Sequence, residues 1–233
     1  MKNSPQSAER LRQMQRWLAE RYGPQHWWPA NSPLEVVLGA YLTQNTAWKA
    51  VERSMDNLRS AGALTLDGLR SLSLEELKDL IRPTGFHSRK APAIKGFLAM
   101  LDEEFEGSLE VLAATPTDLL RRRLLALPGV GPETADAILL YALQHPVPMA
   151  DEYLRRIVER HQLLASAPTR DRKGYETLVQ LTRDAFYADP LDEQRHLFNE
   201  FHALTVAVGK AYCGKTARCS GCPLAGDLGR SPG

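Results

Sequence analysis

Residues 124–156 read LLALPGVGPETADAILLYALQHPVPMADEYLRR, and this stretch is the most informative one about the fold. An aliphatic helix end leads into the tight turn Pro128-Gly129-Val130-Gly131, and a second helix is expected to start at Pro132. Glycines in the turn permit positive φ angles and let another backbone approach closely. The first amides of the second helix have no intrahelical partner, so they suit an anion such as a phosphate. An ordinary helical corner is the alternative for this hairpin taken alone.

A Pro-rich loop follows the second helix and ends at Asp151, which is 20 residues after Gly131. We expect Asp151 to cap the helix that begins there, because aspartate is a preferred N-cap residue. An N-cap carboxylate facing a cleft also suits catalysis, because the helix end favours its ionised form. Asp151 is therefore the catalytic candidate as well as the expected cap.

The rest of the chain shows helical spacing of apolar residues. Residues 6–22 and 34–45 are apolar at helical intervals, and Ser32-Pro33 form an N-cap and first-position pair before the second of these. A similar start of capping residue, acids and aliphatics occurs at Ser73. No segment alternates with a period of two between turn signals. We therefore expect an all-α protein.

Composition places the chain among soluble proteins. It has 233 residues, of which 43% are hydrophobic, and a net charge of +1. The N-terminus has no apolar signal segment and no apolar run is long enough for a membrane span, so we expect a cytoplasmic protein that does not enter membranes. A net charge of +1 is low for a nucleic-acid binder, so a local basic face would have to supply the charge.

The hairpin, the Pro-rich loop and Asp151 together resemble the hallmark of the helix-hairpin-helix, Gly/Pro-rich, Asp (HhH-GPD) glycosylase superfamily, and the endonuclease III-like branch is nearest. Two further segments, residues 42–46 (LTQNT) and 84–91 (TGFHSRKA), resemble motifs of that branch. The resemblance implies an enzyme of base excision repair that flips a damaged base out of duplex DNA. It also implies that Gln44 fills the hole left by the base, and that the segment with Phe86 wedges the opposite strand.

The resemblance implies a two-lobed helical fold with a DNA-binding cleft between the lobes. One lobe is expected at residues 31–143, with the hairpin, and the other at 1–30 plus 144–233. A monovalent cation is expected in the hairpin, bridging to a DNA phosphate. Its ligands would be the carbonyls of Leu125, Leu127 and Val130. The residues expected to contact DNA are Gln44, Phe86, Gly129, Val130, Gly131 and Thr134.

Glu133 separates two reaction types. In bifunctional members of the branch, a lysine two residues after the last hairpin glycine attacks the sugar and forms a Schiff base, so the enzyme also nicks the strand. This sequence has Glu133 there, and a carboxylate cannot form an imine. The resemblance therefore implies a monofunctional glycosylase, in which water attacks and Asp151 stabilises the sugar cation or activates the water. An acid also suits the first turn of a helix.

Tryptophans mark a candidate base pocket. Trp27-Trp28-Pro29 precede the first core helix, and Trp48 follows the Gln44 motif. With Glu133 they resemble the subgroup that removes 3-methyladenine and related alkylated bases. A cationic alkylated purine is a good leaving group and gains cation–π attraction from aromatic walls. Packing between lobes is the alternative for any one of these aromatics. The residues expected around the pocket are Trp27, Trp28, Pro29, Trp48, Glu133 and Lys210.

Three cysteines, Cys213, Cys219 and Cys222, resemble the C-terminal iron–sulfur loop of the endonuclease III branch, whose fourth cysteine would fall near Leu228. Asp227 is the candidate fourth ligand of a [4Fe–4S] cluster, and water or an exogenous thiol could take its place. A lost cluster with vestigial thiols and a zinc site are the alternatives, although no histidine follows at ligand spacing. A cluster would hold a basic loop containing Lys210, Lys215 and Arg218 against DNA phosphates.

The expected partner is double-stranded DNA with a damaged base, bound by a monomeric, nucleoid-associated protein. Two other functions stay open. A bifunctional oxidised-pyrimidine glycosylase and AP lyase would need another amine, such as Lys210, in place of the missing lysine. A non-catalytic DNA-structure binder would use the hairpin alone. Glu133 argues against the first of these and Asp151 against the second.

Overall fold

The computed structural model describes residues 5–188 and 190–229. Within these ranges the chain is helical and has no strand apart from an isolated antiparallel bridge between Cys213 and Ala217. The expectation of an all-α fold is therefore confirmed. The chain divides into two compact units, one formed by Met1–Trp27 with Pro146–Gly233 and the other by Trp28–His145. No helix in the described part is long and apolar enough to cross a membrane.

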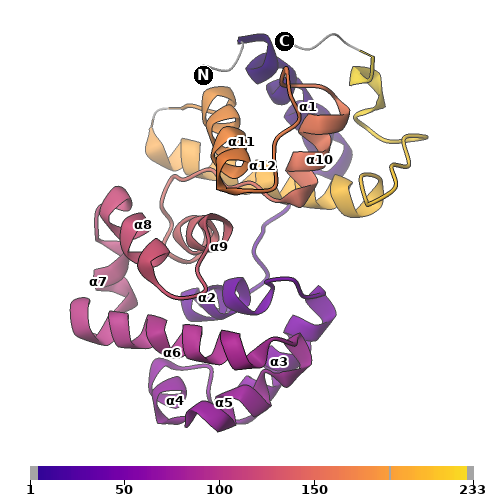
Figure 1. Cartoon of the computed structure of the whole chain (residues 1–233). Coiled ribbons are helices and arrows are strands. Elements are labelled where there is room, and N and C mark those ends of the chain that lie inside the picture. The colour runs from indigo at the N-terminus through magenta and orange to yellow at the C-terminus, as the bar shows by residue number, and fades with distance from the viewer. Residues whose placement is uncertain (1–4, 189, 230–233) are drawn as a thin grey trace. The chain divides into compact units, whose positions relative to one another are not determined.

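The Trp28–His145 unit is built around two helices, α2 (Pro33–Leu42) and α6 (His87–Glu104). The sequence of α2 is apolar on nearly all sides, and every residue from Leu34 to Leu42 is buried. The Ser32 hydroxyl accepts a hydrogen bond from the Glu35 amide, so α2 starts at the expected cap. Figure 1 shows α6 running alongside α2, and α4 and α5 also pack on α6. The remaining helices of this unit are α3 (Trp48–Ser60), α4 (Leu66–Ser71), α5 (Leu74–Leu80), η1 (Arg82–Thr84), α7 (Leu109–Ala113), α8 (Thr117–Ala126), α9 (Pro132–Ala137) and the π-helical turn η2 (Ile138–Ala142).

The expected hairpin consists of α8, a turn and α9. Gly129 in the turn has a φ of +77°, which favours glycine, whereas Gly131 has a φ of −92° and precedes Pro132 as the N-cap. Only the first of these glycines therefore needs a left-handed backbone. Asp136 of α9 is 1% exposed and receives two hydrogen bonds, of 2.6 and 2.9 Å, from the Arg121 guanidinium of α8. This bidentate ion pair links the two helices of the hairpin, α8 and α9.

The unit formed by the two ends of the chain contains α1 (Pro5–Tyr22), α10 (Glu152–Arg160), α11 (Arg172–Ala185), α12 (Leu191–Ala211) and η3 (Ala225–Asp227). Helix α1 packs against α11 and α12, and α10 packs against α12. The packing of α10 on α12 requires a glycine at Gly209 of α12, because a Cβ there would lie 2.2 Å from the ring of Tyr153 on α10. This close approach places the start of α10, and with it Asp151, beside α12.

Candidate active site

Asp151 caps α10, as the sequence predicts. Its Oδ1 accepts a hydrogen bond of 2.8 Å from the Leu154 amide. The residues that precede it, Met149 and Ala150, are buried, and the Asp151 side chain is itself only 12% exposed. Its Oδ2 lies 3.8 Å from Nε2 of His202 on α12. The carboxylate is therefore mostly buried, with Oδ1 bonded to the helix start and Oδ2 facing an imidazole.

Burial raises the pKa of Asp151 to about 6, although the amides of Leu154 and Tyr153 and the charge of Arg156 work in the opposite direction. The expectation that the helix end favours the ionised form is therefore outweighed, because desolvation of the charge is the larger effect here. Burial also lowers the pKa of His202 to about 4, so this imidazole is neutral at pH 7. At neutral pH Asp151 is mostly ionised and more basic than an exposed aspartate. Such a group can accept a proton from water or stabilise a positive charge.

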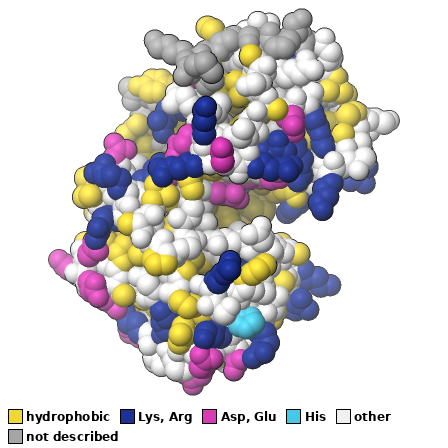
Figure 2. All heavy atoms as spheres, viewed as in Figure 1, with side chains coloured by type: hydrophobic (Ala, Val, Ile, Leu, Met, Phe, Trp, Pro, Cys, Tyr) yellow, Lys and Arg dark blue, Asp and Glu magenta, His cyan; other side chains and the backbone are white. Residues whose placement is uncertain are grey.

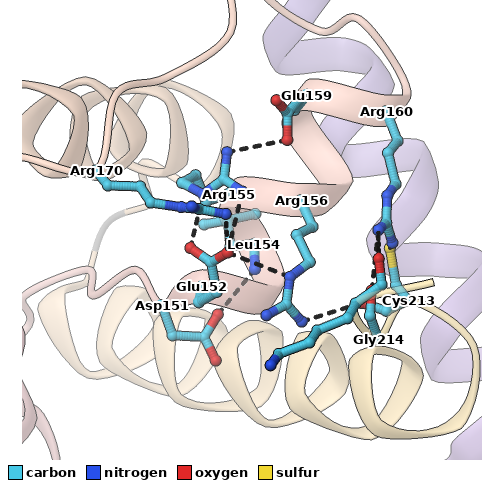
Figure 3. A network of polar contacts seen from close by, with 11 residues as sticks. Asp151, Glu152, Leu154, Arg155, Arg156, Glu159, Arg160, Arg170, Cys213 and Gly214 are labelled. Carbon is cyan, nitrogen blue, oxygen red and sulfur yellow. Dashed lines mark hydrogen bonds and ion pairs between the residues drawn. The ribbon is translucent and has the colours of Figure 1, made fainter. Parts of the chain in front are cut away.

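Arginines surround the acid that follows Asp151 (Figure 3). Glu152 receives hydrogen bonds from Arg155 at 2.6 Å and from Arg156 and Arg170 at 3.2 Å each. The Arg155 bond is the main reason that the pKa of Glu152 is lowered. Figure 2 shows that Lys and Arg side chains also gather in separate groups on the face drawn there, with acids between them. A net charge of +1 thus accommodates local basic groups, which a DNA-binding protein needs.

A small cavity in the Trp28–His145 unit contains part of the predicted base pocket. Its volume is about 130 Å³, and Trp28, Pro29 and Trp48 are in its wall. The rings of Trp28 and Trp48 meet edge to face, with centroids 5.7 Å apart. Tyr141 of the π-helical turn backs Trp28 at 5.4 Å. A cavity of roughly 150 Å³ accepts a benzene ring, so this volume is on the scale of one aromatic ring.

Acidic side chains complete the wall of this cavity. Glu35, Glu52 and Asp56 line it, and Arg59 is the single basic residue that does so. Arg59 bonds to Asp56 at 2.7 Å and lies 3.6 Å from Glu35. Three carboxylates against one guanidinium leave the wall with a formal charge of −2. Aromatic faces and excess negative charge both favour a cation.

The other three residues expected in the pocket are not among those that line this cavity. Glu133 is exposed in the first turn of α9 and does not line the cavity. Trp27 belongs to the unit formed by the chain ends, where the Lys210 ammonium lies 5.5 Å from the centroid of its ring. This is a cation–π contact. Of the six residues expected in the pocket, three therefore line the cavity, namely Trp28, Pro29 and Trp48. Trp27 and Lys210 contact each other, and Glu133 lies on the hairpin.

Gln44 bonds to two of the hairpin residues that are expected to contact DNA. Its Nε2 donates to the carbonyl of Gly129 at 3.1 Å and to the hydroxyl of Thr134 at 3.0 Å. Val130 is buried, and its amide donates a hydrogen bond of 3.2 Å to the Leu127 carbonyl. Phe86 is 59% exposed, which suits a residue that contacts a partner.

Comparison with known proteins decides the family. Residues 38–180 match the model of the HhH-GPD superfamily of base excision DNA repair proteins. The chain belongs to this superfamily. A protein of Methanocaldococcus jannaschii named as a DNA repair glycosylase is 37% identical over 89% of this chain and 90% of its own. A thymine/uracil-DNA glycosylase of Pyrobaculum aerophilum is 30% identical over 87% of this chain and 82% of its own. The structure of the H. pylori 3-methyladenine DNA glycosylase bound to 1,N6-ethenoadenine aligns with a TM-score of 0.71, at 28% identity, over 88% of this chain and 97% of that one.

The chain is thus an HhH-GPD DNA glycosylase of base excision repair, and the predicted family is confirmed. Several residues of the cavity wall and of the Asp151 site were not predicted from the sequence. Glu35, Glu52 and Asp56 resemble ordinary surface acids of helices, although Trp48, Glu52, Asp56 and Arg59 follow each other on α3 at intervals of three or four residues. That spacing places them on one face of the helix and is the signal that would have found them. His202 had no comparable signal.

The predicted cluster loop of this glycosylase has an incomplete ligand set. Cys213, Cys219 and Cys222 are free thiols that line a cavity of about 20 Å³, which is room for roughly a single water molecule. Leu228, at the place of the fourth cysteine, is in the same wall. The Cys213 sulfur accepts a hydrogen bond of 3.0 Å from Arg160. Among the described residues, no group of three or more His, Cys, Asp or Glu side chains is arranged to hold a metal ion. The residues present therefore do not fit a [4Fe–4S] cluster with four protein ligands.

Asp227, the candidate fourth ligand, is bonded to other residues inside the protein. Its carboxylate is 1% exposed and receives two hydrogen bonds from Arg10 of α1, at 3.1 and 2.7 Å. Its Oδ2 is also 3.1 Å from Nδ1 of His161. The buried Arg10 charge needs a counter-charge, and Asp227 supplies it. Sequence distance concealed this partner, because 217 positions separate Arg10 from Asp227.

Proposed function

We propose that this glycosylase is monofunctional and removes cationic, alkylated purine bases such as 3-methyladenine from double-stranded DNA. The single observation that carries the substrate class is the ring-sized cavity in which Trp28 and Trp48 meet an excess of carboxylates. A neutral base gains stacking from such a wall, whereas a cationic base gains stacking, cation–π attraction and Coulomb attraction. The name of the H. pylori neighbour, a 3-methyladenine DNA glycosylase, supports the same class.

Hydrolysis in this proposal uses water and Asp151. The position of the hairpin lysine of bifunctional relatives is Glu133, which supplies no amine for a Schiff base. Asp151 would stabilise the positive sugar that develops as the base leaves, or accept a proton from the attacking water. A cationic base needs little further help as a leaving group. AP lyase activity is therefore absent or weak.

The proposed partner is double-stranded DNA with one damaged base, bound by a monomer at the nucleoid. The hairpin would hold a backbone phosphate at the start of α9, with a monovalent cation at the carbonyls of Leu125, Leu127 and Val130. A cation there would offset repulsion between Glu133 and the phosphate.

Base release from matched duplexes tests the substrate class. One duplex carries 3-methyladenine, a second carries thymine glycol and a third carries thymine opposite guanine, the kind of base that the name of the P. aerophilum relative indicates. Single-turnover release should be fastest by far from the first duplex. Preferential release from either neutral base would contradict the proposal.

Charge and stacking in the cavity are tested separately by two variants. Glu52 is exposed, so Glu52→Gln removes charge at little structural cost and should slow release of 3-methyladenine more than release of a neutral base. Glu103→Gln changes an exposed acid of α6 outside the cavity wall and is the matched control. Trp48→Ala should lose roughly 1–3 kcal/mol of base stacking. It should slow release more than it weakens binding to an abasic-site analogue, which has no base to stack.

A further inference from the structure

Lys90 is a buried lysine with no acidic partner among its hydrogen bonds. It lies in the first turn of α6 and is 4% exposed. Its ammonium donates to the Leu42 carbonyl at 2.7 Å, to the Thr46 hydroxyl at 2.7 Å and to the Thr84 carbonyl at 3.2 Å. An ammonium has three donors, so these three acceptors use its full capacity. Leu42 is the last residue of α2 and Thr84 the last of η1, and carbonyls at helix ends favour a cation.

These contacts join two loops that are far apart in the sequence. The Gln44 loop, residues 43–47, links α2 to α3, and the Phe86 loop, residues 85–86, links η1 to α6. The Thr46 hydroxyl, which accepts from Lys90, also lies 2.7 Å from the Thr84 carbonyl. The ammonium and this hydroxyl therefore form a single hydrogen-bonded junction at the base of both loops.

Each loop carries a residue in a sparsely populated conformation. Asn45 has a φ of +51° and Phe86 a φ of +47°, and neither is glycine. Such conformations persist where the surrounding contacts hold them. Gln44 is also bonded to the hairpin at Gly129 and Thr134. Fixing the junction thus fixes where Gln44 and the exposed Phe86 ring point.

We propose that Lys90 is a positioning residue that couples the Gln44 loop to the Phe86 loop, so that the two side chains enter damaged DNA together. The inference rests on the proposed function, in which both loops probe the duplex. Lys90 touches no reacting atom in this account. It sets the geometry with which the protein distinguishes a duplex with a missing base from an intact one.

A second lysine of α6 provides the comparison. Lys95 donates to the carbonyls of Leu69, Arg70 and Leu72, at 2.7, 3.3 and 2.5 Å. Here too an ammonium bonds to main-chain carbonyls, but these carbonyls belong to the last turn of α4 and the residue after it, and none is part of either loop. Burial lowers the pKa of Lys95 as it lowers that of Lys90, which falls to about 8. Lys95→Met is therefore a control matched in residue, helix and chemistry.

Binding to two duplexes tests the coupling. The first carries one tetrahydrofuran abasic-site analogue, and the second has the same sequence intact. Lys90→Met should reduce the ratio of the two affinities at least about tenfold, because small displacements of positioned groups have large effects. Lys95→Met should leave the ratio unchanged. General loss of folded protein would lower both affinities by one factor, so it would not move the ratio. An unchanged ratio in Lys90→Met would overturn the proposal.

A second variant covers the case in which Lys90→Met does not fold. Thr46→Val removes the hydroxyl of the junction at nearly constant volume, and it should lower the ratio in the same direction. Since the two residues share one junction, the double variant should lose less than the product of the two single effects. Independent, multiplicative effects would contradict a shared junction.

Hydrogen exchange separates this inference from the proposed function. If the wild type itself does not prefer the abasic duplex, the proposed function fails, and the coupling is decided by amide exchange alone. The Thr46 amide is bonded to the Thr43 carbonyl and the Gly85 amide to the Arg82 carbonyl, one in each loop. Lys90→Met should accelerate exchange of both amides together, whereas Lys95→Met should affect neither. Acceleration in only one loop would overturn the coupling.

Discussion

At the scale of single residues, Asp151 combines a structural and a chemical task in one carboxylate. One oxygen caps α10 through the Leu154 amide, and the group as a whole is 12% exposed with a pKa raised to about 6. Its ordinary value is 3.8, so folding makes the ionised form less favourable. At neutral pH the folded protein therefore holds a charged carboxylate that lowers its free energy of unfolding. This is typical of catalytic residues.

Asp151→Asn is expected to separate the two tasks. Asparagine is also a good N-cap, so α10 should remain capped while the charge is lost. Base release should fall by at least about a hundredfold, because electrostatic stabilisation is often the largest catalytic contribution. The melting temperature at pH 7 should rise or stay the same. Single-turnover kinetics and thermal unfolding of the same preparation check both statements. Near-normal base release by the variant would show that Asp151 is only the N-cap of α10.

The raised pKa of Asp151 also sets a pH dependence of opposite sign for rate and stability. The rate of base release should fall as the pH drops through about 6, because the carboxylate is then protonated. Stability should instead fall as the pH rises from about 4 to 6, because the unfolded chain ionises first. The difference of about 2 pKa units corresponds to at most about 3 kcal/mol. Unfolding free energies of wild type and Asp151→Asn should therefore differ at pH 7 and converge near pH 4. Curves that stay parallel across this range would contradict the assignment.

At the scale of elements, the two hairpin glycines have different reasons to be glycine. Gly129 has a φ of +77°, and a Cβ there would lie 3.3 Å from that of Ala93. Gly131 has an extended backbone, and a Cβ there would meet no atom within 4 Å. Nothing inside the protein requires a glycine at the second position. A close external backbone, such as that of DNA, would require it.

Alanine variants of the two glycines should therefore behave differently. Gly129→Ala should lower the unfolding free energy by about 1 kcal/mol or more, because alanine is strained at positive φ. Gly131→Ala should leave the melting temperature unchanged and weaken binding to duplex DNA. Thermal unfolding and a binding titration on both variants check this. Equal DNA affinity of Gly131→Ala and wild type would show that no ligand backbone approaches there.

The helices and caps were largely predictable because they depend on neighbours in the sequence. Ser32-Pro33, the hairpin turn and the Asp151 cap all read directly from local patterns. Contacts between distant segments were not predictable in this way. The carbonyls that hold Lys90 and the carboxylates around Trp48 come together only when helices pack. Burial of Asp151 likewise depends on packing, and so local reasoning gave the wrong direction for its pKa.

At the scale of the whole chain, an ion pair joins its two ends. Arg10 of α1 and Asp227 of η3 are both nearly inaccessible, and Arg10 also donates to the His161 carbonyl at 2.6 Å. Burial lowers the pKa of His161, which favours a neutral imidazole beside Asp227. A buried salt bridge therefore holds the C-terminal segment, with its three thiols, against α1. A metal cluster is not needed for this purpose.

Breaking this pair should be costly. Asp227→Asn leaves the Arg10 charge buried and should lower the unfolding free energy by about 3–5 kcal/mol. Glu9→Gln is the matched control, since it breaks only exposed pairs with Arg12 and Arg16 on the same helix and should leave the unfolding free energy nearly unchanged. Chelation should not change the melting temperature of the wild type. A protein purified with roughly four irons and four sulfides, and destabilised by their removal, would contradict this account.

Base release is expected to occur by hydrolysis, without cleavage of the strand. The most direct measurement is one time course on a duplex with a single 3-methyladenine, end-labelled on the damaged strand and divided after quenching. One half is treated with alkali, which breaks the strand at abasic sites, and the other half is not. We expect the untreated half to stay full length throughout, and cleaved strand to accumulate with time in the alkali-treated half. Equal cleavage in both halves, with a covalent protein–DNA adduct after borohydride, would show that an amine of this chain attacks the sugar and that the claim is wrong.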